Sequence, residues 1–294
     1  METDYRFGRT EGGDESGFND PNVTAFDRGE DLSYYLVREA IQNSIDAVDD
    51  ETKPVEVILD AEHLSRTQFP NADKLAAIFN ACIEYNDDDN ECRMFFGEAL
   101  KTLNKPTIPF LRISDYNTVG LNPVRQKAFL GSVGRSVKNA GSGGSFGLGK
   151  GSLFASSQLR TIFVNSAYAT SNSDTGHFFK GKLRLVSHSW EGFVRQGNGS
   201  YGLANQDPIE DVNSIPHQFN CRDDRHGTDI WIAGFDQALG DNWSTVLINS
   251  VLDNYWLSIA KNKLIVSIGT CIIDKDSLSK TMSDYQGTKT GKKS

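Results

Sequence analysis

The chain has 294 residues, of which 38% are hydrophobic and 23% are charged, a composition typical of a folded globular protein. Its formal net charge of −9 argues against a general nucleic-acid-coating role and leaves only a local basic patch open for nucleic acid. No apolar run approaches the roughly 20 residues that span a bilayer, so we expect no membrane partner. We also expect reduced thiols in a cytoplasmic protein, because no secretory segment opens the chain and no metal-ligand spacing joins the cysteines Cys82, Cys92, Cys221 and Cys271.

The first third of the chain predicts an arm, a long helix, a strand and a helical hairpin. Residues 1–24 are rich in Gly, Asp, Asn and Glu and lack periodicity, so we expect a mobile N-terminal arm that orders against a partner. A helix is predicted from Asp31 to about Asp50, and the alternating run PVEVILD, from Pro54, predicts a strand. Residues 71–104 have helical periodicity in two pieces, which indicates an αα-hairpin insert or a pair of layer helices.

The remainder of the chain predicts strands, three further helices and a glycine-dense loop. A loop-rich stretch is expected at 191–226, and a linker-like tail at 276–294 that leads to a further C-terminal region. The main domain is therefore expected to span 25–275. Helices are predicted at 123–130, 153–157 and 243–260, and strands at 110–115, 160–164, 178–186, 229–232 and 264–273.

The predicted helix around residue 43 carries the first candidate site. Glu39, Asn43 and Asp46 are spaced i, i+4 and i+7, so they project from one helical face. The opposite side carries Val37 and Ile41, with Ser44 or Ile45 and Val48 completing an apolar stripe suited to packing on a sheet. Two carboxylates and an amide on one face can hold a metal ion and activate a water. The alternative is an ordinary solvated polar face.

A second candidate follows the strand predicted at 110–115. Asp115 ends this strand and Gly120 comes shortly after it. An aspartate at a strand end can accept a hydrogen bond from an exocyclic amine, and a glycine permits close approach of the backbone to a ligand. A simple turn is the alternative interpretation.

The third candidate is the sequence GSGGSFGLGKGS at 141–152. Six glycines in twelve residues allow backbone N–H groups to point into a common space, as in loops that cradle phosphates. A flexible linker is the alternative, although linkers seldom contain apolar residues such as Phe146 and Leu148. A P-loop is rejected, because Gly151 occupies the position of the metal-binding Ser or Thr and no apolar strand precedes the loop. The glycine spacing also fails the dinucleotide fingerprint.

The fourth candidate is the pair Gly227-Thr228, which opens the strand predicted at 229–232. A threonine hydroxyl at this position can form a hydrogen bond inward from the sheet. Taken alone this pair is common before strands, so its weight comes from its place in the series of motifs.

The order of the four motifs resembles the GHKL superfamily of ATPases, which includes gyrase B, the ninety-kilodalton heat-shock chaperone, MutL, MORC proteins and histidine kinases. The superfamily's N-box, E-x-x-x-N-x-x-D-A, is matched by Glu39, Asn43, Asp46 and Ala47. Arg38 before the glutamate is most similar to the branch that contains the chaperone, MORC proteins and topoisomerase VI. The resemblance covers residues 34–232.

The second and third superfamily motifs are matched with one departure. In D-x-G-x-G, Asp115 and Gly120 suit the two ends, but Asn117 stands at the first glycine and one residue is inserted. The geometry of this loop is therefore an open question. The third motif, G-x-x-G-x-G, is matched by Gly144, Gly147 and Gly149.

The resemblance implies a two-layer α/β (α+β) sandwich, the Bergerat ATP-binding fold, with a mixed, mostly antiparallel sheet, helices on one face and a lid at about 119–147. It implies that Glu39 is the general base, that Asn43 ligates Mg²⁺, and that Asp115 binds the adenine amine. Asp46, Gly120 and Thr228 are expected beside the nucleotide. The triphosphate is expected in the loop formed by Gly144, Ser145, Phe146, Gly147, Leu148, Gly149 and Lys150.

The implied function is Mg²⁺-dependent ATP binding and slow ATP hydrolysis that gates homodimerisation or a protein effector. Anti-phage defence in bacteria is the biological setting that the resemblance suggests. Two alternatives stay open: an ATP-binding sensor without turnover, and phosphotransfer of the histidine-kinase type. Against the second, no histidine lies in the first 36 residues, where a phosphoacceptor helix would stand.

Overall fold

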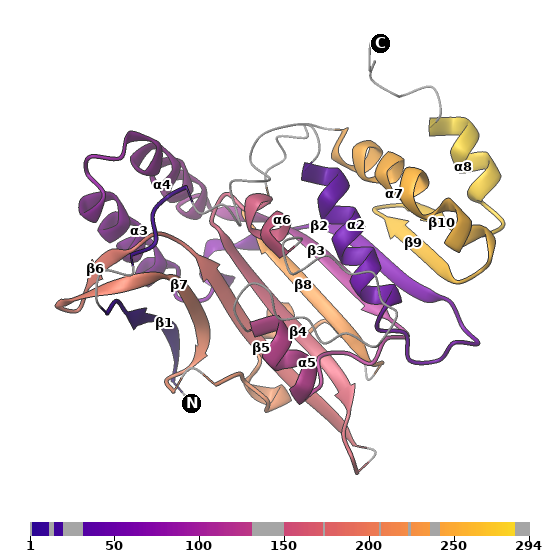
Figure 1. Ribbon diagram of the computed structural model, residues 1–294, viewed down its shortest axis with the longest axis horizontal. Helices are drawn as coiled ribbons and strands as arrows, with labels where there is room; N and C mark the ends of the chain where they lie inside the picture. Colours follow the sequence, from indigo (N-terminus) through magenta and orange to yellow (C-terminus); the bar gives the residue numbers. More distant parts are fainter. Residues whose placement is uncertain are drawn as a thin grey trace.

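A computed structural model joins the ten described strands in one continuous sheet with helices on both sides (Figure 1). The strand order is β1-β7-β5-β4-β8-β3-β2-β9-β10, with β6 paired to β7. Every pairing is antiparallel except that of β2 with β9, which confirms the predicted mixed, mostly antiparallel sheet. The structure describes residues 2–11, 15–19, 32–130, 150–172, 174–205, 207–222, 225–235 and 242–285.

The strands and helices lie mostly where hydrophobic periodicity places them. The predicted strand at 264–273 is in fact the hairpin of β9 and β10. The strands are β1 (Thr3–Arg9), β2 (Val55–Ser65), β3 (Thr107–Tyr116), β4 (Thr161–Ala169), β5 (Thr175–Arg184), β6 (His188–Trp190), β7 (Phe193–Leu203), β8 (Gly227–Ala233), β9 (Leu264–Ile268) and β10 (Cys271–Ile273). The helices are α2 (Leu32–Ile45), α3 (Ala72–Tyr85), α4 (Asn90–Leu103), α5 (Pro123–Leu130), α6 (Lys150–Ala155), α7 (Trp243–Ala260) and α8 (Leu278–Tyr285), with short 3₁₀ turns at Arg66–Gln68, Val212–Ser214 and His217–Phe219.

The two faces of the sheet build two separate hydrophobic cores. Successive side chains of a strand point to opposite faces, so Leu111 and Ile113 of β3 join one core while Ile108 and Phe110 join the other. The first, which we call the α2 core, is formed with the apolar sides of α2, α6 and α7. The second, which we call the aromatic core, contains Phe69, Phe79, Phe96, Phe110, Phe163, Phe179, Phe219 and Trp231.

The helical hairpin of α3 and α4 corrects the expectation that helices cover one face only. Its buried residues, among them Leu75 and Phe79 of α3 and Phe96 of α4, belong to the aromatic core. Figure 1 shows this hairpin beside β6 and β7, away from α2 and α7. A hairpin inserted between β2 and β3 can bury its apolar stripe on the face that α2 does not occupy.

The N-terminal residues correct a second expectation. Residues 3–9 form β1, an edge strand antiparallel to β7, where a mobile arm was predicted. Tyr5 and Phe7 are only 2% and 6% exposed and belong to the aromatic core. Their i, i+2 spacing was the available signal, but the surrounding polar residues hid it. Residues 12–14 and 20–31 lie outside the described part of the chain.

Strand β7 lies in the stretch that was predicted to be loop-rich. Its sequence, FVRQGNGSYGL, has little apolar alternation. A Cβ at Gly199 would lie 2.2 Å from the Phe7 ring, so the bare glycine backbone gives that ring its place. Glycine therefore serves close packing in this strand, and composition alone pointed to a loop.

The ends of α2 and of the chain also differ from the prediction. Helix α2 ends at Ile45 instead of about Asp50, because Val48 pairs with Thr118 in an isolated antiparallel bridge. In the predicted linker tail, residues 278–285 form α8, and Leu278 is buried in the α2 core. Residues 286–294 lie outside the described part.

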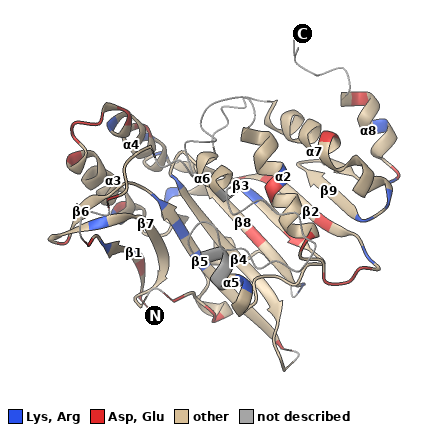
Figure 2. Cartoon of the chain, viewed as in Figure 1, with Lys and Arg blue, Asp and Glu red and all other residues tan. Residues whose placement is uncertain are grey.

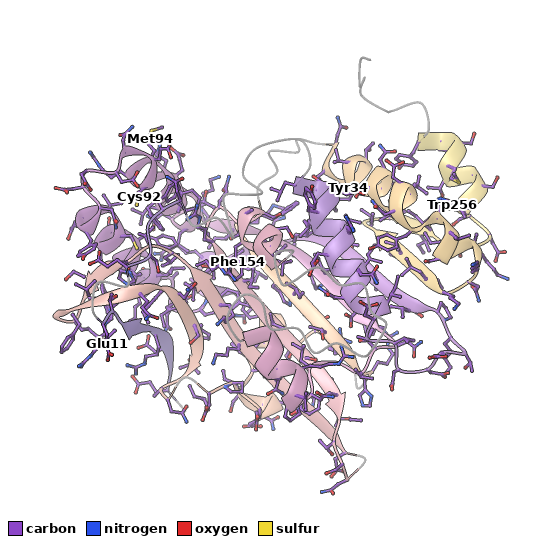
Figure 3. All side chains as sticks on the ribbon, viewed as in Figure 1. Glu11, Tyr34, Cys92, Met94, Phe154 and Trp256 are labelled. Carbon is purple, nitrogen blue, oxygen red and sulfur yellow. The ribbon has the colours of Figure 1, made fainter. Side chains whose placement is uncertain are left out.

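The surface of the described part gives little further evidence of function. None of the described helices is both long and apolar enough to cross a membrane. Met94 on α4 is exposed far from Tyr34 on α2 and Trp256 on α7 (Figure 3). Tyr34 and Trp256 each have one exposed apolar neighbour in the sequence, Tyr35 and Leu257, and small exposed apolar groups are ordinary. All four cysteines are free thiols.

Candidate functional site

The polar face of α2 carries the predicted catalytic residues. Glu39 is half-buried, and Asn43 and Asp46 are exposed. The Asn43 amide nitrogen donates a hydrogen bond to Glu39 Oε1 at 3.2 Å, as the i, i+4 spacing predicts. Asp46 lies one residue beyond the helix end, where Gln42 Nε2 donates to its Oδ1 at 2.8 Å. Figure 2 shows acidic positions along this helix.

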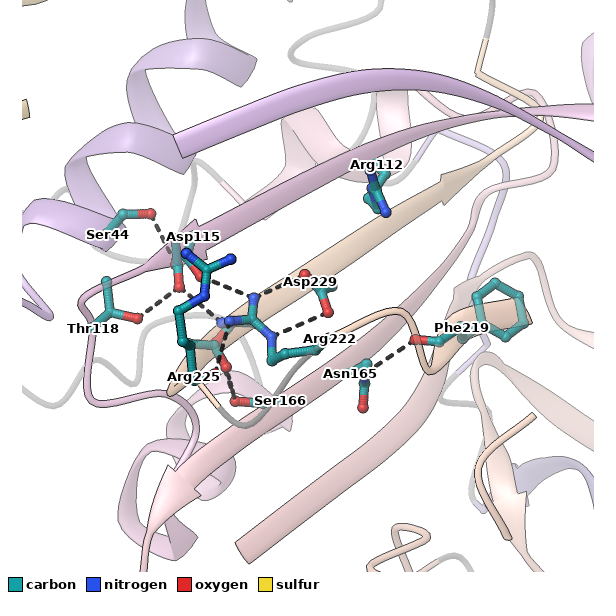
Figure 4. Close-up of polar contacts among 12 residues, drawn as sticks. Ser44, Arg112, Asp115, Thr118, Asn165, Ser166, Phe219, Arg222, Arg225 and Asp229 are labelled. Atoms are coloured by element: carbon teal, nitrogen blue, oxygen red, sulfur yellow. Dashed lines mark hydrogen bonds and ion pairs between the residues drawn. The ribbon is translucent and has the colours of Figure 1, made fainter. Parts of the chain in front are cut away.

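Asp115, at the end of β3, is the point where three motifs meet (Figure 4). The Thr118 hydroxyl donates to Asp115 Oδ1 at 2.6 Å, and the main-chain N–H of Thr228 donates to the same oxygen at 2.8 Å. The Ser44 hydroxyl of α2 donates to Oδ2 at 2.9 Å. The carboxylate therefore joins α2, the loop after β3 and the start of β8, although 71 and 113 positions separate it from Ser44 and Thr228.

The electrostatics of Asp115 combine two opposing effects. Burial raises the pKa of the Asp115 carboxyl above its ordinary value, because a low-dielectric surrounding disfavours the charged form. The Thr118 hydrogen bond, the positive charge of Arg222 and the donors Thr228 and Ser44 oppose that rise in the pKa. The carboxylate is thus a half-buried acceptor held by several donors.

Asn117 shows how the loop accommodates its departure from the D-x-G-x-G pattern. Its φ is +59°, in the left-handed region that a glycine would adopt, and asparagine tolerates this region better than most residues. Its side chain also accepts from Asp50 N–H at 3.0 Å and donates to the carbonyls of Asp50 and Lys53. The substitution keeps the backbone geometry and adds a tie to the segment after α2.

Gly120 and Gly227 stand where a side chain has no room. Gly120 has φ +63°, and a Cβ there would lie 2.3 Å from the Ala167 carbonyl oxygen. Gly227 has φ +145°, and a Cβ there would lie 2.1 Å from the carbonyl oxygen of Asp115. Both glycines therefore allow backbone segments to approach each other closely around the site.

Ser166 of β4 also belongs to the hydrogen-bond network around Asp115, and the sequence analysis did not predict it. Its hydroxyl donates to the Gly227 carbonyl at 2.7 Å and accepts from Leu121 N–H at 2.8 Å. It also lies 3.2 Å from the Thr228 hydroxyl. Thr228 thereby faces inward on the α2 side of the sheet, as predicted.

Four residues of the site escaped the sequence analysis. Ser44 was placed on the apolar stripe, yet its hydroxyl binds Asp115; a hydroxyl within an apolar stripe was the available signal. Thr118 lies inside a motif that was already singled out. Ser166 and Arg222 carried no local signal, because their partners come from distant strands.

Of the predicted triphosphate loop, Gly144 to Lys150, only the main chain of Lys150 lies within the described residues. Residues 131–149, which contain Gly144, Ser145, Phe146, Gly147, Leu148 and Gly149, lie outside the described part, as does the side chain of Lys150. Of the predicted lid, 119–147, the described portion includes α5. Helix α6 begins at Lys150 and packs Leu153 and Phe154 into the α2 core, so the glycine-rich segment does lead into an apolar helix.

The described residues offer a single side-chain oxygen, Asn43 Oδ1, as the predicted Mg²⁺ ligand. Within the described residues, no group of three or more His, Cys, Asp or Glu side chains could hold a metal ion. The Asn43 side-chain N–H donates a hydrogen bond to Glu39 Oε1. Asn43 Oδ1 can therefore act as a neutral oxygen ligand. Mg²⁺ suits such a place, since it is usually bound by one or two protein oxygens together with substrate phosphates and water.

Comparison with known proteins adds no assignment: no family model matches the chain, and no curated protein matches it significantly. The fold and site by themselves define an α/β protein in which a mostly antiparallel sheet presents a half-buried carboxylate beside a helix with a polar face.

Proposed function

We propose that the chain is a GHKL-type ATPase domain of Bergerat fold that binds ATP with Mg²⁺ and hydrolyses it slowly. The observation that carries this proposal is the Asp115 carboxylate, which accepts hydrogen bonds from Ser44 of α2 and from the main chain of Thr228. Three motifs matched in sequence order meet at this one side chain. If the short motifs matched by chance, there would be no reason for them to lie together in the folded chain.

Adenine recognition follows from the acceptors that Asp115 leaves available. Oδ1 accepts from two donors and Oδ2 from one, while a carboxylate offers about four lone-pair sites. Oδ2 can therefore accept a further hydrogen bond from an exocyclic amine. A base with a carbonyl at that position presents an acceptor to an acceptor and is disfavoured.

Hydrolysis is assigned to the polar face of α2. Glu39 is half-buried and held by Asn43, which suits a base that orients and deprotonates a water. Mg²⁺, when bound, supplies charge neutralisation at the phosphates. Asn43 Oδ1 is the side-chain atom that would ligate it, with Asp46 at the helix end as the nearby carboxylate.

Calorimetry with Mg²⁺-ATP tests the binding half of the proposal. We expect one site per chain, weaker binding in EDTA, and weaker binding of ITP, which has a carbonyl in place of the adenine amine. Asp174→Asn, in the exposed β4–β5 turn, is the matched control for Asp115→Asn. No heat of ATP binding to the folded protein contradicts the proposal.

Phosphate release tests the hydrolysis half separately. We expect slow turnover that Glu39→Ala lowers by roughly 10²-fold or more, with ATP affinity within a few-fold of the parent. Binding without any turnover in the parent would favour the alternative of a nucleotide-sensing module.

We also propose that ATP binding drives homodimerisation. The structure changes how the contribution of the N-terminus to the dimer can be tested. Since β1 belongs to the sheet, deleting residues 1–24 would remove core residues and cannot test an arm alone. Residues 15–19 also belong to the fold, because Ser16 and Ser187 form two hydrogen bonds and Phe18 packs on the aromatic core. Deleting only 20–24 keeps these contacts and is the better variant. Light scattering should give a larger mass with a non-hydrolysable ATP analogue than with ADP. An unchanged mass without nucleotide, with ADP and with the ATP analogue rules out ATP-dependent dimerisation of this chain.

A further inference from the structure

A buried arginine lies directly behind the candidate base-binding aspartate. Arg222 precedes β8, and its guanidinium grips Asp229 of β8 with two bonds, Nη2 to Oδ1 at 2.8 Å and Nε to Oδ2 at 3.2 Å. The two side chains are only 2% and 3% exposed. A two-bond Arg–carboxylate pair fixes both position and orientation.

The same guanidinium holds the main chain at the end of β3. Its Nη2 donates to the Asp115 carbonyl oxygen at 2.9 Å, and its Nη1 donates to the Arg225 carbonyl at 3.3 Å. The guanidinium carbon lies 4.5 Å from the centre of the Tyr116 ring. Figure 4 shows this guanidinium between Asp115 and Asp229. Four hydrogen bonds and the Tyr116 ring contact thus converge on one side chain, which leaves it little freedom to move.

Arg222 acts from the opposite side of the sheet to the candidate nucleotide. Asp229 alternates with Thr228 and Ile230 along β8, so it points toward the aromatic core, while Thr228 points toward α2. The Asp115 side chain meets Ser44 on the α2 side. Arg222 therefore touches the Asp115 main chain from behind and leaves the carboxylate free to face a ligand.

The packing around this contact is too tight for adjustment. A Cβ at Gly227 would lie 2.1 Å from the Asp115 carbonyl oxygen and 2.6 Å from Arg222 Nη1. Glycine at 227 is thus required by the arginine and by the strand end together. A buried ion pair adds little net stability compared with apolar residues of similar size, so its contribution here is geometry.

We propose that Arg222 is a positioning residue for base recognition: it fixes the end of β3 so that the Asp115 carboxylate is held toward the exocyclic amine of an adenine. This inference rests on the proposed function. It assigns Arg222 to discrimination between purines.

The test replaces the whole pair, because removing one partner leaves an unpaired buried charge that is strongly destabilising. The variant is Arg222→Met/Asp229→Asn. The matched control is Arg112→Met/Asp60→Asn, a pair on the neighbouring strands β3 and β2 with an N–O distance of 2.9 Å. Arg112 is three residues before Asp115 on β3 and forms ion pairs with Asp60 and Glu62.

The dissociation constants of Mg²⁺-ATP and Mg²⁺-ITP are measured by competition against a fluorescent ATP analogue. Folded protein is confirmed by circular dichroism in each case. For Arg222→Met/Asp229→Asn we expect about tenfold weaker ATP binding with ITP binding unchanged, the loss of one hydrogen bond to a charged group. The preference for ATP over ITP then falls about tenfold, while the control pair keeps the parent preference.

The outcomes separate this inference from the proposed function. A folded double variant with the parent ATP-to-ITP preference overturns the role of Arg222 and leaves the ATPase proposal intact. Equal weakening of ATP and ITP overturns it too, since that result indicates a structural role only. If the parent binds neither nucleotide, both proposals fail. Should the double variant not fold, Arg222→Lys, which keeps the charge but not the planar fork, decides by the same ratio.

Discussion

The two faces of this sheet use the same strands for different purposes. On the aromatic face, seven or more large rings pack against one another, with Phe163 lying 4.8 Å from Phe219 and 5.6 Å from Phe69 between ring centres. On the α2 face, apolar packing stops near the end of β3, and hydroxyls and a carboxylate replace it. Strand β3 contributes to both: Phe110 lies in the aromatic core, and five residues later Asp115 points to the α2 face and accepts the hydrogen bond of Ser44.

The comparison indicates how a site can be polar without weakening the fold. Ring packing buries large apolar areas and supplies most of the stability. Polar groups at the strand ends form a hydrogen-bonded ring in which the carboxylate of Asp115 satisfies several donors. We therefore expect substitutions of the buried rings to change stability, and substitutions of the polar groups around Asp115, together with the Arg222–Asp229 pair behind it, to change ligand binding or turnover.

The largest expected effect is on the aromatic face. Phe163→Ala should lower the free energy of unfolding by about 3–5 kcal/mol, because it removes a buried ring and leaves a cavity. Urea denaturation measures the change, and Met94→Ala, at a site 65% exposed, should change it by less than about 0.5 kcal/mol. ATP affinity of the folded variant should equal that of the parent. A tenfold change in affinity would show that the two faces are coupled.

Next in size is the effect of Glu39→Ala on turnover. Loss of a general base should slow phosphate release by roughly 10²-fold or more, with ATP affinity within a few-fold of the parent. Glu91→Ala, an exposed glutamate of α4, serves as the control and should turn over normally. Equal rates in Glu39→Ala and the parent would remove Glu39 from the mechanism.

Asp115→Asn should weaken ATP binding by about tenfold to a hundredfold. The amide replaces one acceptor oxygen by a donor in a buried place, where such mismatches cost about 1.5–3 kcal/mol. Calorimetry on folded protein measures the change, and Asn43→Ala should instead remove the difference between binding with Mg²⁺ and in EDTA. Parent-like affinity in Asp115→Asn means that Asp115 serves only the loop.

The smallest effect is a pH dependence that the Asp115 pKa produces. Because burial raises this pKa, the native state holds the proton more tightly than the unfolded chain does, whose aspartates titrate near 3.9. As the pH falls through the raised pKa, protonation of Asp115 adds to the stability of the native state, while ATP affinity declines because the acceptor is lost. Calorimetry at a series of pH values stepped downward from neutral should show a decline in the ATP affinity of the parent that is reduced in Asp115→Asn. Parallel profiles would contradict the assignment.

Hydrophobic periodicity was sufficient for the elements with a strong local pattern. The strands around Val57 and Ile113 and the helix at Trp243–Ala260 are where the sequence predicts them, because burial on one face imposes a period on the residues themselves. The i, i+4 contact of Glu39 with Asn43 also follows from local geometry. The nucleotide-binding function implied by the motifs stays a prediction.

Long-range partners decided what the sequence left undetermined. Strand β1 exists because Phe7 packs over Gly199, about two thirds of the chain length away, and no local pattern contains that contact. Ser44 looked like part of an apolar stripe until β3 placed Asp115 beside it. Arg222 became part of the site only because β3 and β8 are neighbours. Composition and spacing determine which segments can be helix or strand, whereas the partner of a hydroxyl, a guanidinium or a glycine depends on which strands the fold brings together.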